Sequence, residues 1–412
     1  MILHPFRQSS LSYLLAIFLF SLISSPGETP AYDTSPPAQP VRLIFIHHST
    51  GQNWLTDDNG GLGIALMNNN YFVSDSNYGW GPDGIGNNTD IGHWYTWFRG
   101  PSSSTYLTAL YAESGQTFSF SRLVTQPGGE NEIVMFKSCF PNSALRGSVS
   151  DPVPAIGGNP LRNQESGSQY HTVSNAKGIY IDLLNYFSTR RDKLFIVITA
   201  PPLSDPTYAA NARAFNQWLV NDWLAGYPYN NVAVFDFYNV LTTNNGTAAT
   251  NDLGLETGNH HRWWQGAIQH KTDGDNDADP NVLEYPSGDD HPSRAGNLKA
   301  KDEFIQLLNI FYNSWKGGDI TPPMACVEGT TLDCYSSLQS SYDHAGNGGA
   351  ILVRGVPFNE DLTAGSTKQI TITGGYNSDY SSVASFTTLN GTLTVKYGSL
   401  TLGNLVIGPA GI

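Results

Sequence analysis

The sequence predicts an α/β protein, in which a doubly wound parallel sheet lies between helices, followed by a small all-β domain. Short continuous apolar runs, typical of buried parallel strands, recur along the chain up to residue 316. Between these runs, apolar residues return every three or four positions, which indicates amphipathic helices. After residue 316 such stretches stop, and short β-type runs separated by Gly and Asn take their place.

The expected elements alternate along the first part of the chain. Expected strands cover residues 41–46, a brief 71–73, 132–136, 194–199 and 232–237. Expected long helices cover residues 171–187, 209–224 and 295–315. Because strands and helices alternate, the sheet should be parallel and the helices should cover both of its faces in three layers.

The tail carries expected strands of a different kind. These cover residues 350–353, 369–373, 392–396 and 399–407, and the first two start about 19 residues apart. A long helix is not expected among them, although residues 338–344 have room for a turn or two of helix. The spacing resembles the first coils of a right-handed parallel β-helix. A small β-sandwich is the alternative.

The length of 412 residues suits two folded parts with terminal extras. A basic start, an apolar run and a small-residue exit predict a signal peptide, and the run is too short for a transmembrane helix. Because no cysteine follows that run, a lipid anchor is not expected. The mature protein should therefore be secreted, periplasmic or at the cell surface, without a membrane span. The predicted parts are a signal peptide at 1–31, a linker at 32–40, a first domain at 41–316, a second linker at 317–335 and a β-rich domain at 336–412.

Charge and cysteine content restrict the partners and the compartment. The net charge is −14, from 35 acidic and 21 basic side chains, so nucleic acids and anionic lipids should be repelled. Cys326 and Cys334 are close in sequence and are expected to pair in an oxidising compartment. Cys139 is then left alone, and we interpret it as a small buried residue rather than a nucleophile. The oligomeric state does not follow from the sequence.

Two distant segments supply the residues of a nucleophilic site. Ser49 follows the first expected strand, and ligand sites in parallel α/β sheets form at the carboxyl ends of the strands. A serine hydroxyl needs a base to remove its proton, and the base needs a third group that holds its ring. His291 precedes the last long helix, and Asp289 and Asp290 stand directly before it. Asp289 is the first choice as orienting group and Asp290 the second.

With an asparagine after the third strand, Asn142, these residues resemble the SGNH (GDSL-like) hydrolases over roughly residues 41–315. The IHHSTG opening and the DDHPSRAGN ending look like an uncharacterised bacterial branch of that family. The resemblance implies an SGNH-type fold and an esterase with Ser49 as nucleophile and His291 as base. It also implies oxyanion donors at the Ser49 amide, the Asn142 side chain and the amide of a glycine, for which Gly79 is the candidate.

The chain departs from the family pattern at several points. His47-His48 replaces the usual Gly-Asp before the serine, and Gly288 occupies the place where the orienting Asp usually stands. Some family members work with a Ser-His dyad, so the departure at Gly288 is compatible with catalysis. The substrate class that the resemblance implies is an acylated carbohydrate or a similar small ester. The alternative is a non-catalytic, secreted carbohydrate-binding or adhesion protein on the same scaffold.

Other residue groups carry secondary hypotheses. Substrate contacts are expected at His48, Trp263 and Trp264, with core packing of the two tryptophans as the alternative. The proposed ester chemistry needs no metal or cofactor, whereas a metal-dependent hydrolase that uses His47, His48 and His291 is the minor reading. An acidic stretch has the ligand alternation of a calcium loop, with a solvated loop as the stronger alternative. Its expected ligands are Asp273, Asp275, Asp277, Asp279 and Glu284.

Overall fold

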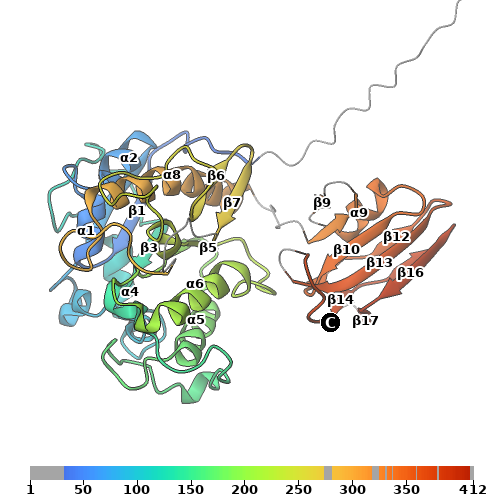
Figure 1. Cartoon of the computed structure of the whole chain (residues 1–412), viewed down its shortest axis with the longest axis horizontal. Coiled ribbons are helices and arrows are strands. Elements are labelled where there is room, and N and C mark those ends of the chain that lie inside the picture. The colour runs from blue at the N-terminus through green and yellow to red at the C-terminus, as the bar shows by residue number, and fades with distance from the viewer. Residues whose placement is uncertain are drawn as a thin grey trace, which may run out of the picture. The chain divides into compact units, whose positions relative to one another are not determined.

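The apolar runs expected as buried strands form one central sheet (Figure 1). The computed structural model describes residues 32–272, 281–317, 324–329, 332–335, 337–358, 360–377 and 380–408. Five parallel strands stand in the order β2-β1-β3-β4-β5, namely β1 (Val41–Ile46), β2 (Tyr71–Ser76), β3 (Ile133–Lys137), β4 (Leu194–Ile198) and β5 (Val232–Phe235). All of their residues are buried, which explains the continuous apolar runs. The predicted α/β class is confirmed.

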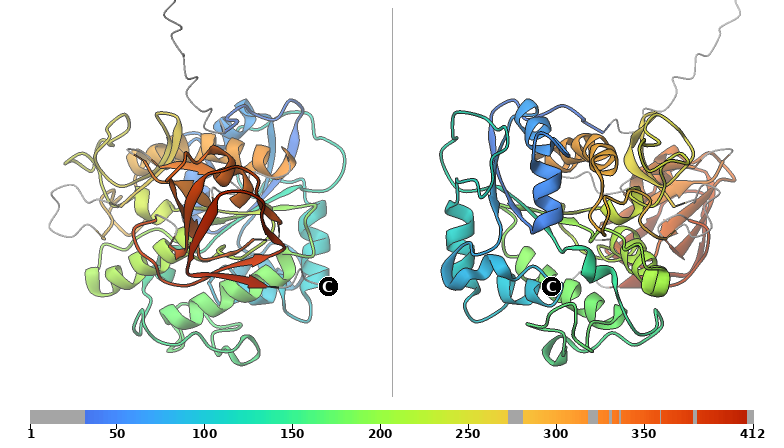
Figure 2. Two further views of the ribbon diagram at one scale, coloured as in Figure 1. Left: turned by 90° about the vertical axis from the view of Figure 1, so that its right-hand side faces the viewer. Right: turned by 60° about the vertical axis from the view of Figure 1, so that its left-hand side comes forward.

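Helices cover both faces of this sheet, as the two views of Figure 2 also show. Alternate residues of β1 enter two separate cores: Leu43 and Phe45 the first, Ile44 and Ile46 the second. The helices that supply side chains to the first core are α1 (Ser49–Leu55), α2 (Leu62–Asn68), the short α7 (Phe237–Val240) and α8 (Arg294–Gly317). Those of the second core are α3 (His93–Phe98), α4 (Ser103–Ala112), α5 (Val173–Phe187) and α6 (Ala209–Asn221).

Side-chain caps explain where two elements differ from the predicted bounds. Helix α5 begins at Val173 rather than 171 because the Thr172 side chain accepts a hydrogen bond from the Asn175 amide. Strand β5 ends at Phe235 because Asp236 caps a short helix, α7 (Phe237–Val240). The polar end of β2 extends to Ser76, beyond the apolar residues that made the strand recognisable.

Several shorter elements were not predicted. The hairpin of β6 (His260–Trp264) and β7 (Ala267–Lys271) turns at Gln265 and Gly266, which both have positive φ as a two-residue hairpin turn requires. The short 3₁₀ helices are η1 (Pro82–Asn87), η2 (Phe140–Ser143), η3 (Ile156–Gly158) and η4 (Pro206–Tyr208). The expected linker 32–40 is held against the domain, since Asn309 donates to the Thr34 carbonyl and Asn70 to the Pro37 carbonyl.

The C-terminal part consists mainly of short strands arranged in three sheets. The largest has the order β16-β13-β10-β8-β9, in which β10, β13 and β16 are mutually parallel. The other two, β11-β14-β17 and β12-β15, are parallel throughout. The strands are β8 (Ala325–Val327), β9 (Asp333–Tyr335), β10 (Ala350–Arg354), β11 (Pro357–Phe358), β12 (Leu362–Ala364), β13 (Gln369–Tyr376), β14 (Thr387–Asn390), β15 (Leu393–Val395), β16 (Ser399–Gly403) and β17 (Leu405–Gly408).

The second expected linker, 317–335, is wrong in its later half. Strands β8 and β9 lie inside it and pair with β10 and with each other, so the β-rich part begins earlier than residue 336. The disulfide predicted between Cys326 and Cys334 is confirmed, and it joins these two strands. Residues 338–344 form the short helix α9 (Leu338–His344), as the sequence allowed.

Two predictions fall partly or wholly outside the described residues. The signal peptide at 1–31 is one, and the acidic residues from Asp273 to Asp279 of the expected calcium loop are the other. Within the described ranges, the helices are all too short or too polar to span a membrane.

Candidate active site

Ser49 lies where β1 ends and α1 begins, and buried contacts fix the turn around it. The neighbouring His47 is fully buried, with its Nε2 3.1 Å from an Asp75 carboxylate oxygen at the end of β2 and its Nδ1 3.0 Å from the His48 carbonyl. A side chain at Gly51 would collide with His47, since an added Cβ would lie 2.4 Å from the His47 Cβ. The HHSTG sequence is thus a tightly packed turn that presents the Ser49 hydroxyl group at the carboxyl edge of the sheet.

His48, directly before Ser49, is fixed by contacts with Gly86 and Tyr78. Its Nε2 donates to the Gly86 carbonyl at 2.6 Å, and its ring stacks on Tyr78 with centroids 3.8 Å apart. Burial lowers the pKa of His48 to about 4, so the imidazole is neutral at neutral pH. With an exposed fraction of 8% and one face covered, His48 has a supporting position in place of the substrate contact expected from the sequence.

The structure brings Ser49 and His291 together across 242 residues of chain. The His291 Nε2 lies 2.9 Å from the Ser49 Oγ, and the His291 Nδ1 lies 3.0 Å from an Asp289 carboxylate oxygen. Because a carboxylate only accepts, Nδ1 carries the proton of the neutral ring and Nε2 is free to accept from Ser49. The Phe140 ring packs edge-on against the imidazole at 5.0 Å and limits its rotation. This is the geometry that a serine nucleophile, its base and an orienting group require.

The two aspartates before His291 have separate positions. Asp289 accepts from both the His291 ring and the His291 backbone amide, the latter at 2.9 Å, and these bonds lower the pKa of its carboxyl group. Asp290 instead accepts from the Ser204 amide at 2.8 Å, which ties this loop to the loop after β4. At Gly288, φ is +109°, a backbone conformation that favours glycine. The carboxylate beside His291 is therefore that of Asp289, one position after the glycine.

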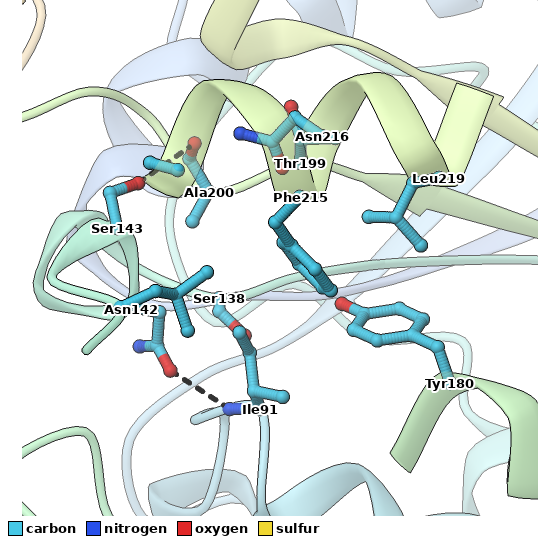
Figure 3. A pocket seen from close by; sticks show the side chains of 12 residues that line it. Ile91, Ser138, Asn142, Ser143, Tyr180, Thr199, Ala200, Phe215, Asn216 and Leu219 are labelled. Atoms are coloured by element: carbon cyan, nitrogen blue, oxygen red, sulfur yellow. Dashed lines mark hydrogen bonds between the residues drawn. The ribbon is translucent and has the colours of Figure 1, made fainter. Parts of the chain in front are cut away.

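Two of the three expected oxyanion donors already donate hydrogen bonds to other groups of the protein. The Asn142 side-chain amide donates to an Asp90 carboxylate oxygen at 2.6 Å and to the Cys139 carbonyl at 3.3 Å, which uses both of its hydrogens. Its oxygen accepts from the Ile91 amide, as Figure 3 shows. The Gly79 amide donates to Asn87 at 2.9 Å. Of the three, the Ser49 amide alone lacks an acceptor among the described residues.

Behind Asn142 lies a small cavity between the sheet and helices α5 and α6 (Figure 3). Its volume is about 10 Å³, which is room for a single water molecule. The apolar wall includes Tyr180, Phe215 and Leu219, and the polar wall includes Ser138 and Asn216. The cavity is therefore too small to accept an acyl chain.

Sequence reasoning missed a buried lysine close to Ser49. The Lys137 ammonium group at the end of β3 donates to the Thr50 hydroxyl and, at 3.0 Å, to the Ser138 carbonyl. It has no carboxylate partner among the described residues, and burial lowers its pKa to about 8. The only signal for it was a charged residue directly after the apolar run IVMF.

Cys139 lies directly beside the candidate nucleophile. Its Sγ lies 3.6 Å from both the Ser49 Oγ and the Thr50 Oγ1. Burial by itself raises the pKa of the thiol, but the Lys137 ammonium and the contacts with the Ser49 and Thr50 hydroxyl groups bring that pKa below its ordinary value. The sulfur thus shares the site with Ser49, in contact with the same hydroxyl group as the base.

The remaining candidates pack elsewhere in the domain. Trp263 packs edge-on against Tyr32 at 5.6 Å, and the Arg262 guanidinium covers the Trp264 ring at 3.8 Å, so core packing describes both better than sugar stacking. The Glu284 carbonyl and carboxylate accept from Asn244. The described ranges contain no group of three or more His, Cys, Asp or Glu side chains that could hold a metal ion, and His47, His48 and His291 do not form one.

Comparison with protein-family models, with curated proteins and with solved structures finds no match to this chain.

Proposed function

We propose that this protein is a serine ester hydrolase of the SGNH type. The observation that carries the proposal is the contact between the Ser49 Oγ and the His291 Nε2 at 2.9 Å, with Asp289 on the opposite ring nitrogen. In a neutral ring oriented in this way, Nε2 is placed to take the serine proton. The parallel sheet and the helices on both of its faces are consistent with such a scaffold.

The proposed reaction has two steps. The Ser49 Oγ attacks the acyl carbon while its proton passes to the His291 Nε2, and Asp289 stabilises the imidazolium that forms. His291 then returns the proton to the leaving alcohol as the bond from the acyl carbon to that oxygen breaks. A water molecule, activated by the same imidazole, releases the acyl group and regenerates Ser49.

The setting and the substrate class belong to the proposal as well. An acylated carbohydrate is the proposed substrate, on the resemblance of the HHSTG and DDHPS segments to the family. The N-terminal apolar run and the Cys326–Cys334 disulfide support export into an oxidising compartment. The parallel pairing of β10 with β13, and of β13 with β16, supports coils of a β-helix in the C-terminal part.

Hydrolysis of p-nitrophenyl acetate, p-nitrophenyl butyrate and acetylated glycans by the wild type and by Ser49→Ala tests the proposal. We expect turnover by the wild type and a loss of about 10⁴-fold or more in the variant. Ser104→Ala, on an exposed helix surface, is the matched control and should retain full activity. Cys139 lies next to Ser49, the residue in contact with His291. If Ser49→Ala keeps residual turnover, and this turnover disappears when Cys139→Ala is added, the Cys139 thiol is the nucleophile. Equal activity in the wild type and Ser49→Ala, or none in either, would contradict the proposal.

A further inference from the structure

The parallel ladders of the C-terminal part differ at their two ends. The first ladder consists of β10, β13 and β16, the second of β11, β14 and β17, and the third of β12 and β15 (Figure 1). At the end where the ladders begin, β8 pairs with the outer edge of β10. On the outer edge of β12, the Gln339 side chain of α9 accepts from the Thr363 amide at 2.7 Å and donates to the Thr363 carbonyl at 3.2 Å. These two edges therefore already have hydrogen-bond partners.

The strands at the other end have no such cover among the described residues. Strands β15, β16 and β17 each pair on one side only, with β12, β13 and β14 respectively. We call their outer edges, which lie within residues 393–408, the open end. Each edge presents backbone N–H and C=O groups to which a further strand can bind.

The open end also exposes side chains that continue the core face of the ladders. In a parallel pair, two residues in register point to the same face of the sheet. Three exposed side chains of the open end are in register with buried ones: Leu402 (37% exposed) with Ile372 (0%), Ile407 (47%) with Leu389 (0%), and Val395 (48%) with Ala364 (1%). The preceding strands are covered by a next layer at these positions, and the open end is not.

Charge favours a second copy of the same chain as the cover. The net charge of the chain is −14, so two copies repel each other over most of their surfaces. Residues 380–412 contain no acidic side chain and one basic side chain, Lys396. Edge strands that stay unpaired are commonly protected by several charges or by proline, and the open end has Lys396 alone. Two copies can therefore meet there without burying acidic groups.

We propose that the open end is the contact surface of a homodimer. A two-fold axis brings the identical edges together, so that β16 pairs with β16 of the partner in the antiparallel direction. The side chains of Leu402, Ile407 and Val395 become buried in both copies. Stacking of further chains is blocked because β8 and Gln339 cover edges at the opposite end of the ladders. The assembly thus closes at two chains.

Sedimentation equilibrium of the full-length protein, from about 1 to 100 µM, tests the proposal, and we expect the mass of two chains. Ile407→Lys and Val395→Lys each place an ammonium group in the contact, so each should weaken the dimer Kd by about tenfold or more. Both side chains are about half exposed in the single chain, so a lysine there can reach solvent in the monomer. Val149→Lys, at a valine of the first domain with 48% exposure, is the matched control and should keep the wild-type Kd.

Amide hydrogen exchange locates the contact. Pairing of the two edges protects the outward amides of β16, so peptides from residues 399–408 should exchange more slowly in the wild type than in Ile407→Lys. Peptides from β10 should exchange equally in both proteins. Circular dichroism checks that each variant is folded. Because Ile407 and Val395 belong to different ladders, one variant still decides the question if the other unfolds.

Three results would overturn the proposal. The first is a monomer at every concentration, and the second is a dimer whose Kd neither lysine variant changes. The third is a series of polymers longer than two chains, because the covered edges at the opposite end should prevent them. A dimer that both lysine variants weaken, with protection at residues 399–408, supports it.

Discussion

Two histidine–carboxylate pairs belong to the candidate site, and they differ in burial far more than in geometry. His47 and Asp75 are 3.1 Å apart with no exposed side-chain surface, whereas His291 and Asp289 are 3.0 Å apart with exposed fractions of 22% and 63%. The first pair spans two strands of the sheet, and the second is closed within one loop. The same histidine–carboxylate hydrogen bond therefore stabilises the fold where it is buried. Where it is exposed, it leaves an imidazole available for proton transfer.

The largest expected effect is on activity, at the exposed pair. His291→Gln removes the base, so kcat/KM for p-nitrophenyl acetate should fall by about 10⁴-fold or more. Because this pair is open to solvent, the free energy of unfolding in urea should change by less than about 1 kcal/mol. A variant that keeps its activity would remove His291 from the mechanism.

The same substitution at the buried pair should act on stability. His47→Gln replaces the fixed bond from a packed ring to the buried Asp75 carboxylate by one from a flexible amide, while Asp75 keeps its bond from the Thr117 amide, so the cost should be about 1–3 kcal/mol. Urea unfolding followed by tryptophan fluorescence measures this loss, with His291→Gln as the matched control. If the two variants unfold at the same urea concentration, burial does not separate the two pairs.

Acid should destabilise the fold through three histidines that burial keeps neutral, His48, His171 and His261. Burial lowers the pKa of His48 and His171 to about 4 and that of His261 to about 3, below the value of about 6.5 of an unfolded chain. Between those values the unfolded chain binds more protons, so the free energy of unfolding is retained above pH 6.5 and falls as the pH drops toward 4. The loss is at most about 3 kcal/mol for one histidine.

Urea midpoints at pH 7.0 and pH 4.5 measure this loss. His171→Phe removes one of the three groups and should show a smaller drop in stability between the two pH values than the wild type. An unchanged drop would show that His171 does not contribute to the acid response.

The smallest expected effect concerns the orienting carboxylate. Asp289→Asn should lower kcat by about 10- to 10²-fold. This loss is smaller than the loss expected for a buried orienting carboxylate, because solvent screens the exposed pair. Asp290→Asn is the control, since its carboxylate binds the Ser204 amide and not the imidazole. A larger loss at Asp290 than at Asp289 would reverse their roles.

The sequence by itself determined the buried strands and the order of the residues that carry chemistry. The runs at β1, β3 and β4 are apolar except for Arg42 and Lys137, because both faces of the sheet are covered, and this pattern can be recognised in the sequence. Ser49 and His291 were also readable as candidates, from a hydroxyl after a strand and a His-Pro before the last helix.

Only the tertiary structure decided which side chains meet. The Asn142 amide donates to Asp90 across 52 residues of chain, a contact that local patterns do not encode. Asp289 and Asp290 are adjacent in sequence, but in the folded chain Asp289 contacts His291 and Asp290 contacts Ser204. Hydrogen-bond partners depend on distances between segments, and those are set by how the layers pack.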